Sequence, residues 1–471
     1  MRRQLFIAGA GAMTALALPH LSPRARAAET VRFTLRAAPL NFSPARGLSF
    51  ACVAFNGTIP GPVLRVVAGQ RVRATFVNDG TSGSTVHWHG MILPNAMDGV
   101  ENVTQPPVGR GGSFTYEFVA NPSGTRWYHD HITYGLARGL FVAFVVEDPA
   151  DERADAEFVL VFHDVPKFST IDEAMHGISN APMIDPLDSP EMRSMRPDDR
   201  MGDEVAYAAH CINGASYPAI APLVVKVGQR VRLRVLNANL NQTRYVRLAG
   251  HRLMVTHSDG NRLAQPLEVD ALRVGVGERY DAWFEVTRPG AWLLEGLSSD
   301  RLAFRQAAVV ATEGSERMTP LRSPQGLDGV DYFTYEKAGG LSGTSLKAML
   351  ATHAYTLDGG GYGSERWTMN AATYPRTAKI YVKRGQSLEV RFKNRTDMDH
   401  PMHLHGHTFD VVEVDGKALA RPIPKDTSLV GANGGTIAWR LIADSPSGRW
   451  LLHCHNAIHM MDGMMTELIY R

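Results

Sequence analysis

The amino-acid sequence predicts an all-β protein made of three consecutive, similar domains. A self-comparison finds one pattern three times, at residues 66–78, 225–237 and 382–394. In each copy a Gly-Gln pair is followed by alternating apolar and polar residues and ends on Asn, which indicates a turn leading into a half-buried strand. The repeated glycines lie 159 and 157 residues apart, an ordinary domain length. A composition with 44 Gly, 27 Pro and only 20% charged residues is typical of many short strands and turns.

The repeat also sets the expected domain boundaries. We expect the first domain at residues 30–149, the second at 157–312 and the third at 353–471. A linker at 313–352 contains Gly-Gly and Ser-Gly pairs, which indicate irregular structure. An insertion at 167–203 carries five methionines and several prolines, and we expect it to form a loop.

The N-terminal residues 1–27 are expected to be a signal peptide. Arg2 and Arg3 precede a Gly- and Ala-rich apolar run, and the Ala-Arg-Ala sequence at 25–27 resembles a cleavage site. Paired arginines before a weakly hydrophobic run favour the twin-arginine route. We therefore expect an exported protein, periplasmic or secreted.

Charge and cysteine content narrow the class of protein further. The whole chain carries a net charge of +2, and loss of the four arginines of the signal peptide would change it to −2, so nothing favours nucleic-acid binding. No other apolar run approaches the length of a membrane span, and we expect a monomer without one. Cys52 and Cys211 leave two states open, a disulfide or two free buried thiols.

The chemistry of the chain is concentrated near its C-terminus. His453, Cys454 and His455 are consecutive, so on an extended strand the two imidazoles point to one face and the thiol to the other. His459 and Met464 follow 5 and 10 positions after the cysteine. With one more imidazole, this thiolate, imidazole and thioether set is what a redox-active copper centre requires. The plainer interpretation is a strand with chance histidines and a buried thiol.

Comparison of the three copies favours the copper interpretation. Histidines that served a common core would recur in every copy, yet the second domain has arginine or alanine where the third has His400, His403 and His405. The first domain keeps four histidines, but Asp130 stands in the place of Cys454. These four are His87, His89, His129 and His131. Histidines that vary while the surrounding pattern persists indicate ligand sets rather than packing residues.

Four histidine-rich motifs now stand in chain order: H-W-H-G, W-Y-H-D-H, H-P-M-H-L-H-G-H and H-C-H-x3-H-x4-M. Together they resemble the motifs of the multicopper oxidases, and the resemblance covers essentially the whole mature chain. It implies three cupredoxin-like domains, each a Greek-key β-barrel. It also implies four copper ions, with one type 1 ion in the third domain and a cluster of one type 2 and two type 3 ions between the first and third domains.

The resemblance assigns ligands and roles residue by residue. The type 1 copper would take His400, Cys454, His459 and the axial Met464. The type 2 copper would take His87 and His403. The type 3 pair would take His89, His129, His131, His405, His453 and His455. Cys454, His453 and His455 would carry electrons between the two sites, and Asp98 would lie near the type 2 copper and assist proton transfer.

The implied reaction is one-electron oxidation of a phenolic, aromatic amine or low-valent metal-ion reductant, coupled to reduction of dioxygen to water. We therefore expect a laccase-like oxidase, with a cuprous or other metal-ion oxidase in copper tolerance as the alternative. A copper nitrite reductase would not need six type 3 histidines, and a copper-free scaffold would have lost its ligands. Many bacterial relatives place a Glu directly after the last type 1 histidine, where this chain has Met460, so the proton route of those relatives is not evident here.

Overall fold

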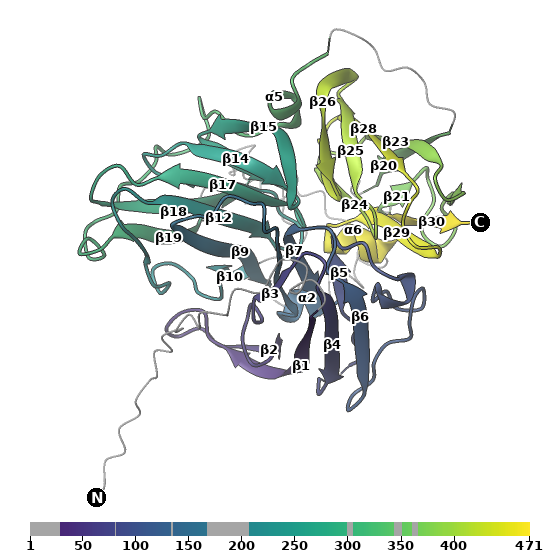
Figure 1. The fold of residues 1–471 in the computed structure, drawn as a ribbon, viewed down its shortest axis with the longest axis horizontal. Helices are drawn as coiled ribbons and strands as arrows, with labels where there is room; N and C mark the ends of the chain where they lie inside the picture. The colour runs from purple at the N-terminus through teal and green to yellow at the C-terminus, as the bar shows by residue number, and fades with distance from the viewer. Residues whose placement is uncertain are drawn as a thin grey trace, which may run out of the picture.

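In a computed structural model the chain is described at residues 29–80, 82–132, 135–166, 207–298, 305–342, 351–359 and 366–471. The predicted signal peptide at 1–27 and the methionine-containing insertion at 167–203 lie outside these residues. The described parts are nearly all strands with a few short helices, as Figure 1 shows, and the all-β prediction is confirmed. None of the helices described is long and apolar enough to cross a membrane.

The first unit consists of two four-stranded sheets, with the strand orders β2-β1-β4-β6 and β3-β8-β7-β5. Its strands are β1 (Thr30–Phe42), β2 (Phe50–Phe55), β3 (Leu64–Val67), β4 (Arg71–Asn78), β5 (His87–His89), β6 (Ser113–Val119), β7 (Gly124–His129) and β8 (Phe141–Glu147). Its short helices are η1 (Asn95–Met97) and α2 (Gly135–Arg138).

The second unit has a six-stranded sheet, β10-β9-β12-β17-β14-β15, and a five-stranded sheet, β11-β19-β18-β13-β16. The first of these contains β9 (Ala156–Pro166), β10 (Tyr207–Ile212), β12 (Arg230–Asn237), β14 (Leu253–Ser258), β15 (Asn261–Val269) and β17 (Arg279–Glu285). The other contains β11 (Leu223–Val225), β13 (Arg244–Leu248), β16 (Ala271–Val274), β18 (Ala291–Ser298) and β19 (Arg305–Thr312). Helix α5 (Tyr335–Gly339) follows in the connection to the third unit.

The third unit repeats this plan, with sheets ordered β21-β20-β23-β28-β25-β26 and β22-β30-β29-β24-β27. The first sheet contains β20 (Thr352–Asp358), β21 (Thr368–Met369), β23 (Ser387–Asn394), β25 (Phe409–Val414), β26 (Lys417–Lys425) and β28 (Thr436–Ile442). The second contains β22 (Ile380–Val382), β24 (His400–Leu404), β27 (Thr427–Val430), β29 (Arg449–Cys454) and β30 (Met465–Tyr470), with helix α6 (Ala457–Asp462) between the last two.

The repeated segment found in the sequence forms the same element in every unit. It contributes strands β4, β12 and β23, which alternate between sheet faces and end on Asn78, Asn237 and Asn394. Each of these asparagines donates its side-chain amide to a backbone carbonyl, of Val108, Val274 and Val430 respectively. A buried amide that pairs with the backbone in this way explains why the pattern closes on Asn.

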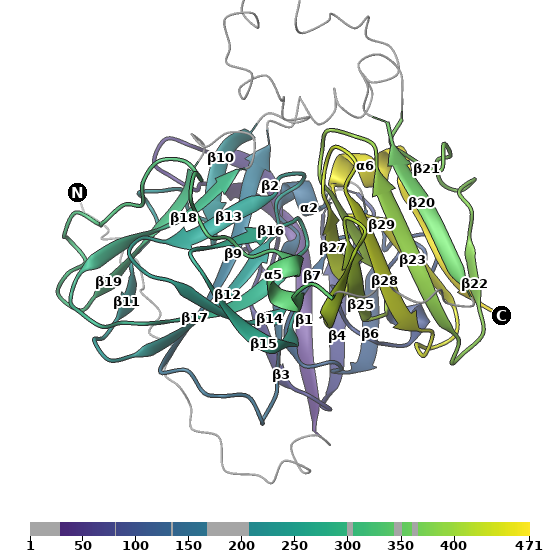
Figure 2. The ribbon, with the colours of Figure 1, turned by 90° about the horizontal axis from the view of Figure 1, so that it is seen from above.

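The three units meet along their edges, as Figures 1 and 2 show. Strands β5 and β7 of the first unit lie next to β24, β29 and α6 of the third in Figure 1, and the ring of His89 on β5 stacks on that of His403 on β24. The second unit lies beside both. Cys52 and Cys211, in the first and second units, are free and buried, so the structure has the second of the two states that the sequence leaves open.

Candidate metal centre

Strands β5 and β7 place the histidines of the first unit. His87 lies directly opposite His129 in this antiparallel pair. Alternation along β5 turns Trp88, which lies between the two histidines, into the hydrophobic core, while His87 and His89 face the third unit. The tryptophan therefore fixes the strand that presents both imidazoles.

Strands β24 and β29 do the same in the third unit, where His403 lies opposite His453 and Met402 opposite Cys454. The adjacent residues His453 and Cys454 point to different groups of side chains. The thiol lies near His400 and His459, whereas the rings of His453 and His455 lie 5.5 and 5.9 Å from that of His403. This is the division that the sequence pattern predicts.

Eight buried histidines meet between the first and third units, and we call them the eight-histidine cluster. They are His87, His89, His129, His131, His403, His405, His453 and His455. Nitrogen atoms of His131, His405 and His453 lie within 4.8 Å of one another. The same limit holds for the group of His89, His129 and His455, and for that of His87, His89 and His403.

The hydrogen bonds of the cluster leave one ring nitrogen of most histidines without a protein partner. The unpartnered buried atoms are His87 Nε2, His89 Nδ1, His129 Nε2, His131 Nε2, His403 Nε2 and His455 Nε2. The Nε2 atoms of His405 and His453 face each other at 3.0 Å. Buried polar atoms are normally satisfied, so unpaired nitrogens on histidines that gather in groups of three fit bound metal ions.

Burial also keeps these imidazoles in the state that binds metals. Desolvation lowers the pKa of His453 to about 4 and that of six others well below the usual value. The six are His89, His129, His131, His403, His405 and His455. Neutral imidazoles offer the nitrogen lone pair that copper takes.

Asp98 joins the two halves of the cluster. Its carboxylate Oδ2 accepts a hydrogen bond from His405 Nδ1 at 2.9 Å, and its Oδ1 lies 3.3 Å from His87 Nδ1. Its backbone carbonyl accepts from the same His87 nitrogen at 2.8 Å. These bonds fix the tautomer in which Nε2 of each ring is free to bind a metal.

The second group, which we call the cysteine site, lies inside the third unit and consists of His400, Cys454, His459 and Met464. Cys454 Sγ lies 3.6 Å from His400 Nδ1 and 3.4 Å from His459 Nδ1, and the two nitrogens are 3.0 Å apart. All four residues are buried. Backbone hydrogen bonds join Met464 to both Cys454 and His459, which holds the thioether residue beside the other three.

The histidines of the cysteine site are also held at their outer nitrogens. His400 Nε2 lies 2.8 Å from Thr396 Oγ1, and His459 Nε2 lies 2.9 Å from Asn456 Nδ2. Asn456 additionally caps helix α6, because its side-chain oxygen accepts from the backbone N–H of Ile458 and His459. The cap thus ties the position of His459 to the strand that carries Cys454.

Three residues at these sites carry no sequence signal that would have identified them. The ring of Trp367 lies 3.8 Å from that of His459 and covers it. Asp426 Oδ1 and Thr427 Oγ1 lie 3.0 and 2.9 Å from His89 Nε2. Each stands outside any histidine motif. His459 lies 92 positions after Trp367, and His89 lies more than 300 positions before Asp426 and Thr427.

The second unit has other side chains at the positions that correspond to these histidines. In the register of its strands, Arg247 lies opposite Glu295, as His403 lies opposite His453 in the third unit. Arg247 Nε donates to Glu295 Oε2 at 3.1 Å, and both side chains are buried. A buried ion pair therefore occupies the place of two histidines.

One small cavity adjoins the cluster, and a second cavity shares Asp130 and Ile132 with it. The first, of about 20 Å³, is lined by Asp130, Met460 and four of the cluster histidines, and the second, of about 100 Å³, lies on the far side of Asp130. Met460 therefore brings a thioether to the cavity that these histidines line. A larger cavity of about 350 Å³ between the first and second units is lined by charged side chains and by none of these histidines.

Comparisons with known proteins agree with this geometry. Family models described as multicopper oxidase match residues 37–151, 188–312 and 350–471. The chain is 32% identical to multicopper oxidase MmcO of Mycobacterium tuberculosis, over 98% of this chain and 91% of that protein. It is 23% identical to copper resistance protein A of Pseudomonas syringae pv. tomato, over 91% of this chain and 90% of that protein. The structure is also similar to the solved structure of laccase from Botrytis aclada, with a TM-score of 0.74 and 21% sequence identity. The match covers 94% of this chain and 88% of that laccase.

Proposed function

Since the chain belongs to the multicopper oxidase family, whose members are copper-binding oxidoreductases that use oxygen, we propose that it is a laccase-like oxidase of phenolic and aromatic substrates. The proposal depends chiefly on the unpartnered nitrogens of the eight-histidine cluster. Two residues of that cluster, His453 and His455, are the chain neighbours of Cys454, whose thiol lies beside two other imidazoles. A structural metal site would not need two groups of different ligand chemistry joined in this way.

The proposed ligands follow the grouping of the side chains. The cysteine site would hold a type 1 ion, His87 and His403 a type 2 ion, and the other six cluster histidines a type 3 pair, which makes four copper ions. Bound copper would supply one-electron oxidation of the reductant at the cysteine site and reduction of dioxygen to water at the cluster.

The residues of the chain would connect and orient these sites. Cys454 belongs to one site, and its chain neighbours His453 and His455 belong to the other, so a short run of covalent bonds joins them. Asp98 would hold a proton on Nδ1 of His405 and so keep the Nε2 lone pair available. Asp98 is also the carboxylate that we propose assists proton transfer, because it touches rings from both units.

The cellular setting belongs to the same proposal. Arg2 and Arg3 before an apolar run support export by the twin-arginine route to the periplasm or beyond. We propose a monomer, because the described contacts between units already complete both sites within one chain.

A metal-ion oxidase in copper tolerance is the second candidate, and one feature favours it. Helix α6, which carries His459, also carries the half-buried Met460 and Met461, whose thioethers suit Cu(I). The similarity to a protein named for copper resistance supports the same candidate.

One experiment separates the two candidates. Steady-state oxygen uptake is measured with a phenol, Cu(I), Fe(II) and Mn(II) on a single copper-loaded preparation, with Cys454→Ser as the control. We expect a blue protein with the highest kcat/KM for the phenol, and a variant that loses the blue absorption but keeps the near-ultraviolet absorption of the type 3 pair. A preference for Cu(I) would replace the laccase-like proposal by the second candidate, and a copper-loaded protein without blue colour would reject both.

A further inference from the structure

The residues Asp426 and Thr427 hold two histidines of the cluster that come from different units. Asp426 Oδ1 and Thr427 Oγ1 contact His89 Nε2, as described above, which leaves Nδ1 of that ring to face the cluster. His403 Nδ1 donates to the Asp426 carbonyl at 2.8 Å and lies 3.1 Å from Thr427 Oγ1. One dipeptide therefore sets the orientation of a ring from the first unit and a ring from the third.

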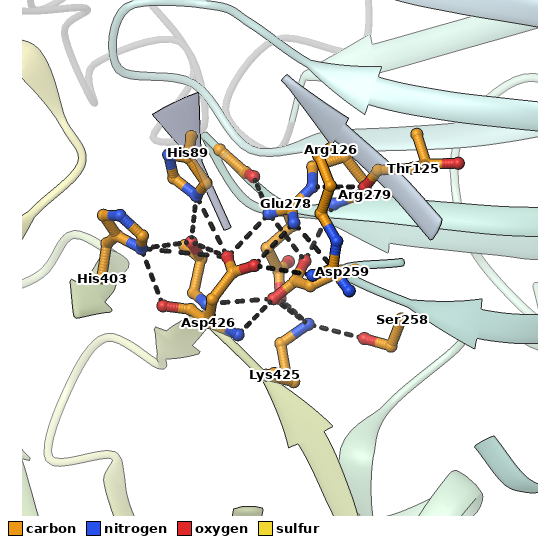
Figure 3. Close-up of polar contacts among 12 residues, drawn as sticks. His89, Thr125, Arg126, Ser258, Asp259, Glu278, Arg279, His403, Lys425 and Asp426 are labelled. Atoms are coloured by element: carbon orange, nitrogen blue, oxygen red, sulfur yellow. Dashed lines mark hydrogen bonds and ion pairs between the residues drawn. The ribbon is translucent and has the colours of Figure 1, made fainter. Parts of the chain in front are cut away.

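The second unit holds this dipeptide in place, as Figure 3 shows. The guanidinium of Arg279 donates to both carboxylate oxygens of Asp426, at 2.7 and 2.6 Å. The backbone N–H groups of Asp426 and Thr427 donate to Asp259 Oδ2 at 3.2 and 3.0 Å. Neither Asp259 nor Arg279 touches a histidine of the cluster in these contacts, and both lie in the unit without copper ligands.

The network is buried and balanced in charge. Its carboxylates are Asp259, Glu278 and Asp426, and its cations are Arg126, Arg279 and Lys425. All six side chains are at most 1% exposed. Bidentate pairing fixes direction as well as charge, so the Asp426 carboxylate has little freedom to rotate away from His89.

The third unit contains a copy of the same turn without this network. Asp259 and Asp415 have φ values of 47° and 48°. Asp259 Oδ1 accepts from Arg279 N at 3.0 Å, as Asp415 Oδ1 accepts from Thr436 N at 2.9 Å. The turn itself thus needs only the first oxygen, and an arginine is not required at the position of Thr436. In the second unit, Oδ2 of Asp259 and the guanidinium of Arg279 both contact the dipeptide of Asp426 and Thr427.

We propose that Arg279 and Asp259 of the copper-free second unit are positioning residues for the eight-histidine cluster, acting through Asp426 and Thr427. The inference rests on the proposed function, because it takes the cluster to bind copper. It assigns the second unit a role in copper binding at a site to which it contributes no ligand.

The test uses substitutions that retain charge or shape, since an unpaired buried carboxylate would threaten the fold. Arg279→Lys replaces the bidentate donor by a point charge, and Asp259→Asn removes one charged acceptor. The matched controls are Arg247→Lys, which breaks a buried pair of the same unit away from the cluster, and Asp415→Asn, which changes the same turn in the third unit. Each protein is loaded with copper, and four properties are measured: copper content, blue absorption, the electron paramagnetic resonance spectrum of the type 2 ion, and thermal unfolding of the apo-protein.

We expect Arg279→Lys and Asp259→Asn to bind cluster copper about 10- to 100-fold more weakly and to change the type 2 spectrum, with the blue absorption retained. The controls should keep the wild-type spectra even if they lower the unfolding temperature by as much as Arg279→Lys and Asp259→Asn do. Wild-type copper content and type 2 spectrum in both variants would overturn the inference, as would equal spectral changes in the controls. A wild-type protein that takes up no copper would instead overturn the proposed function.

Discussion

Asp98→Asn is expected to slow oxygen reduction while leaving the cysteine site intact. The substitution keeps the shape of the side chain but removes its charge and one of two acceptor oxygens, which face His405 and His87. A hydrogen bond to a charged group contributes about 1.5–3 kcal/mol. At about 1.4 kcal/mol per factor of ten, this corresponds to a loss of about 10- to 100-fold in cluster copper affinity or in turnover.

The assay is oxygen uptake with a phenolic substrate at saturating copper, together with the copper content and the blue absorption. The blue absorption should be unchanged, because Asp98 contacts the cluster and not the cysteine site. Asp444→Asn, at an exposed position outside both sites, serves as the matched carboxylate control. Copper affinity of the cluster and turnover that both stay within about twofold of wild type in Asp98→Asn would refute the positioning argument.

Two further substitutions test the surroundings of the cysteine site and the third unit. Trp367→Leu uncovers the ring of His459, so kcat/KM for a bulky phenol should rise. The lost burial of the tryptophan should destabilise the fold by about 3 kcal/mol. Unchanged kinetics would contradict the covering role of Trp367. Burial raises the pKa of Glu467, but hydrogen bonds from Arg449, Tyr374 and Lys379 bring it down to about 2. Because this value lies below the ordinary 4.5, the carboxylate stabilises the fold above pH 4.5 and loses that effect as the pH falls toward 2. Denaturant titrations should therefore show the difference in stability between wild type and Glu467→Gln shrinking over that range, and a constant difference would count against the pairing.

The features that sequence reasoning predicts are those with a local pattern. Strands β4, β12 and β23 were predictable because each alternates and closes on a buried asparagine. The histidines were predictable because alternation within a strand places residues two apart on one face, as at His87 and His89. The proposed separation of His453 from Cys454 rests on the same geometry.

Other features depend on contacts between distant segments. Which histidines form a group depends on strand register and on the docking of the first unit against the third, neither of which is written in a short motif. Asp426 lies 337 positions from His89, and the Lys-Asp-Thr sequence around it matches none of the histidine motifs. Trp367 likewise reads as an ordinary core aromatic until the ring of His459 is placed beneath it.

The separation of the two halves of the cluster along the chain constrains how the protein is made. Asp98 and His405 are 307 positions apart, and both strands of the third unit that carry cluster histidines belong to the last quarter of the chain. Contacts of such long range form late in folding, because the loop-closure entropy must be overcome before they stabilise anything. A ribosome-bound chain that has finished only its first two units holds four of the eight histidines and no thiol of the cysteine site. On the proposed function, copper could therefore complete the eight-histidine cluster only after the third unit has formed and docked on the first, whereas the cysteine site needs only the folded third unit.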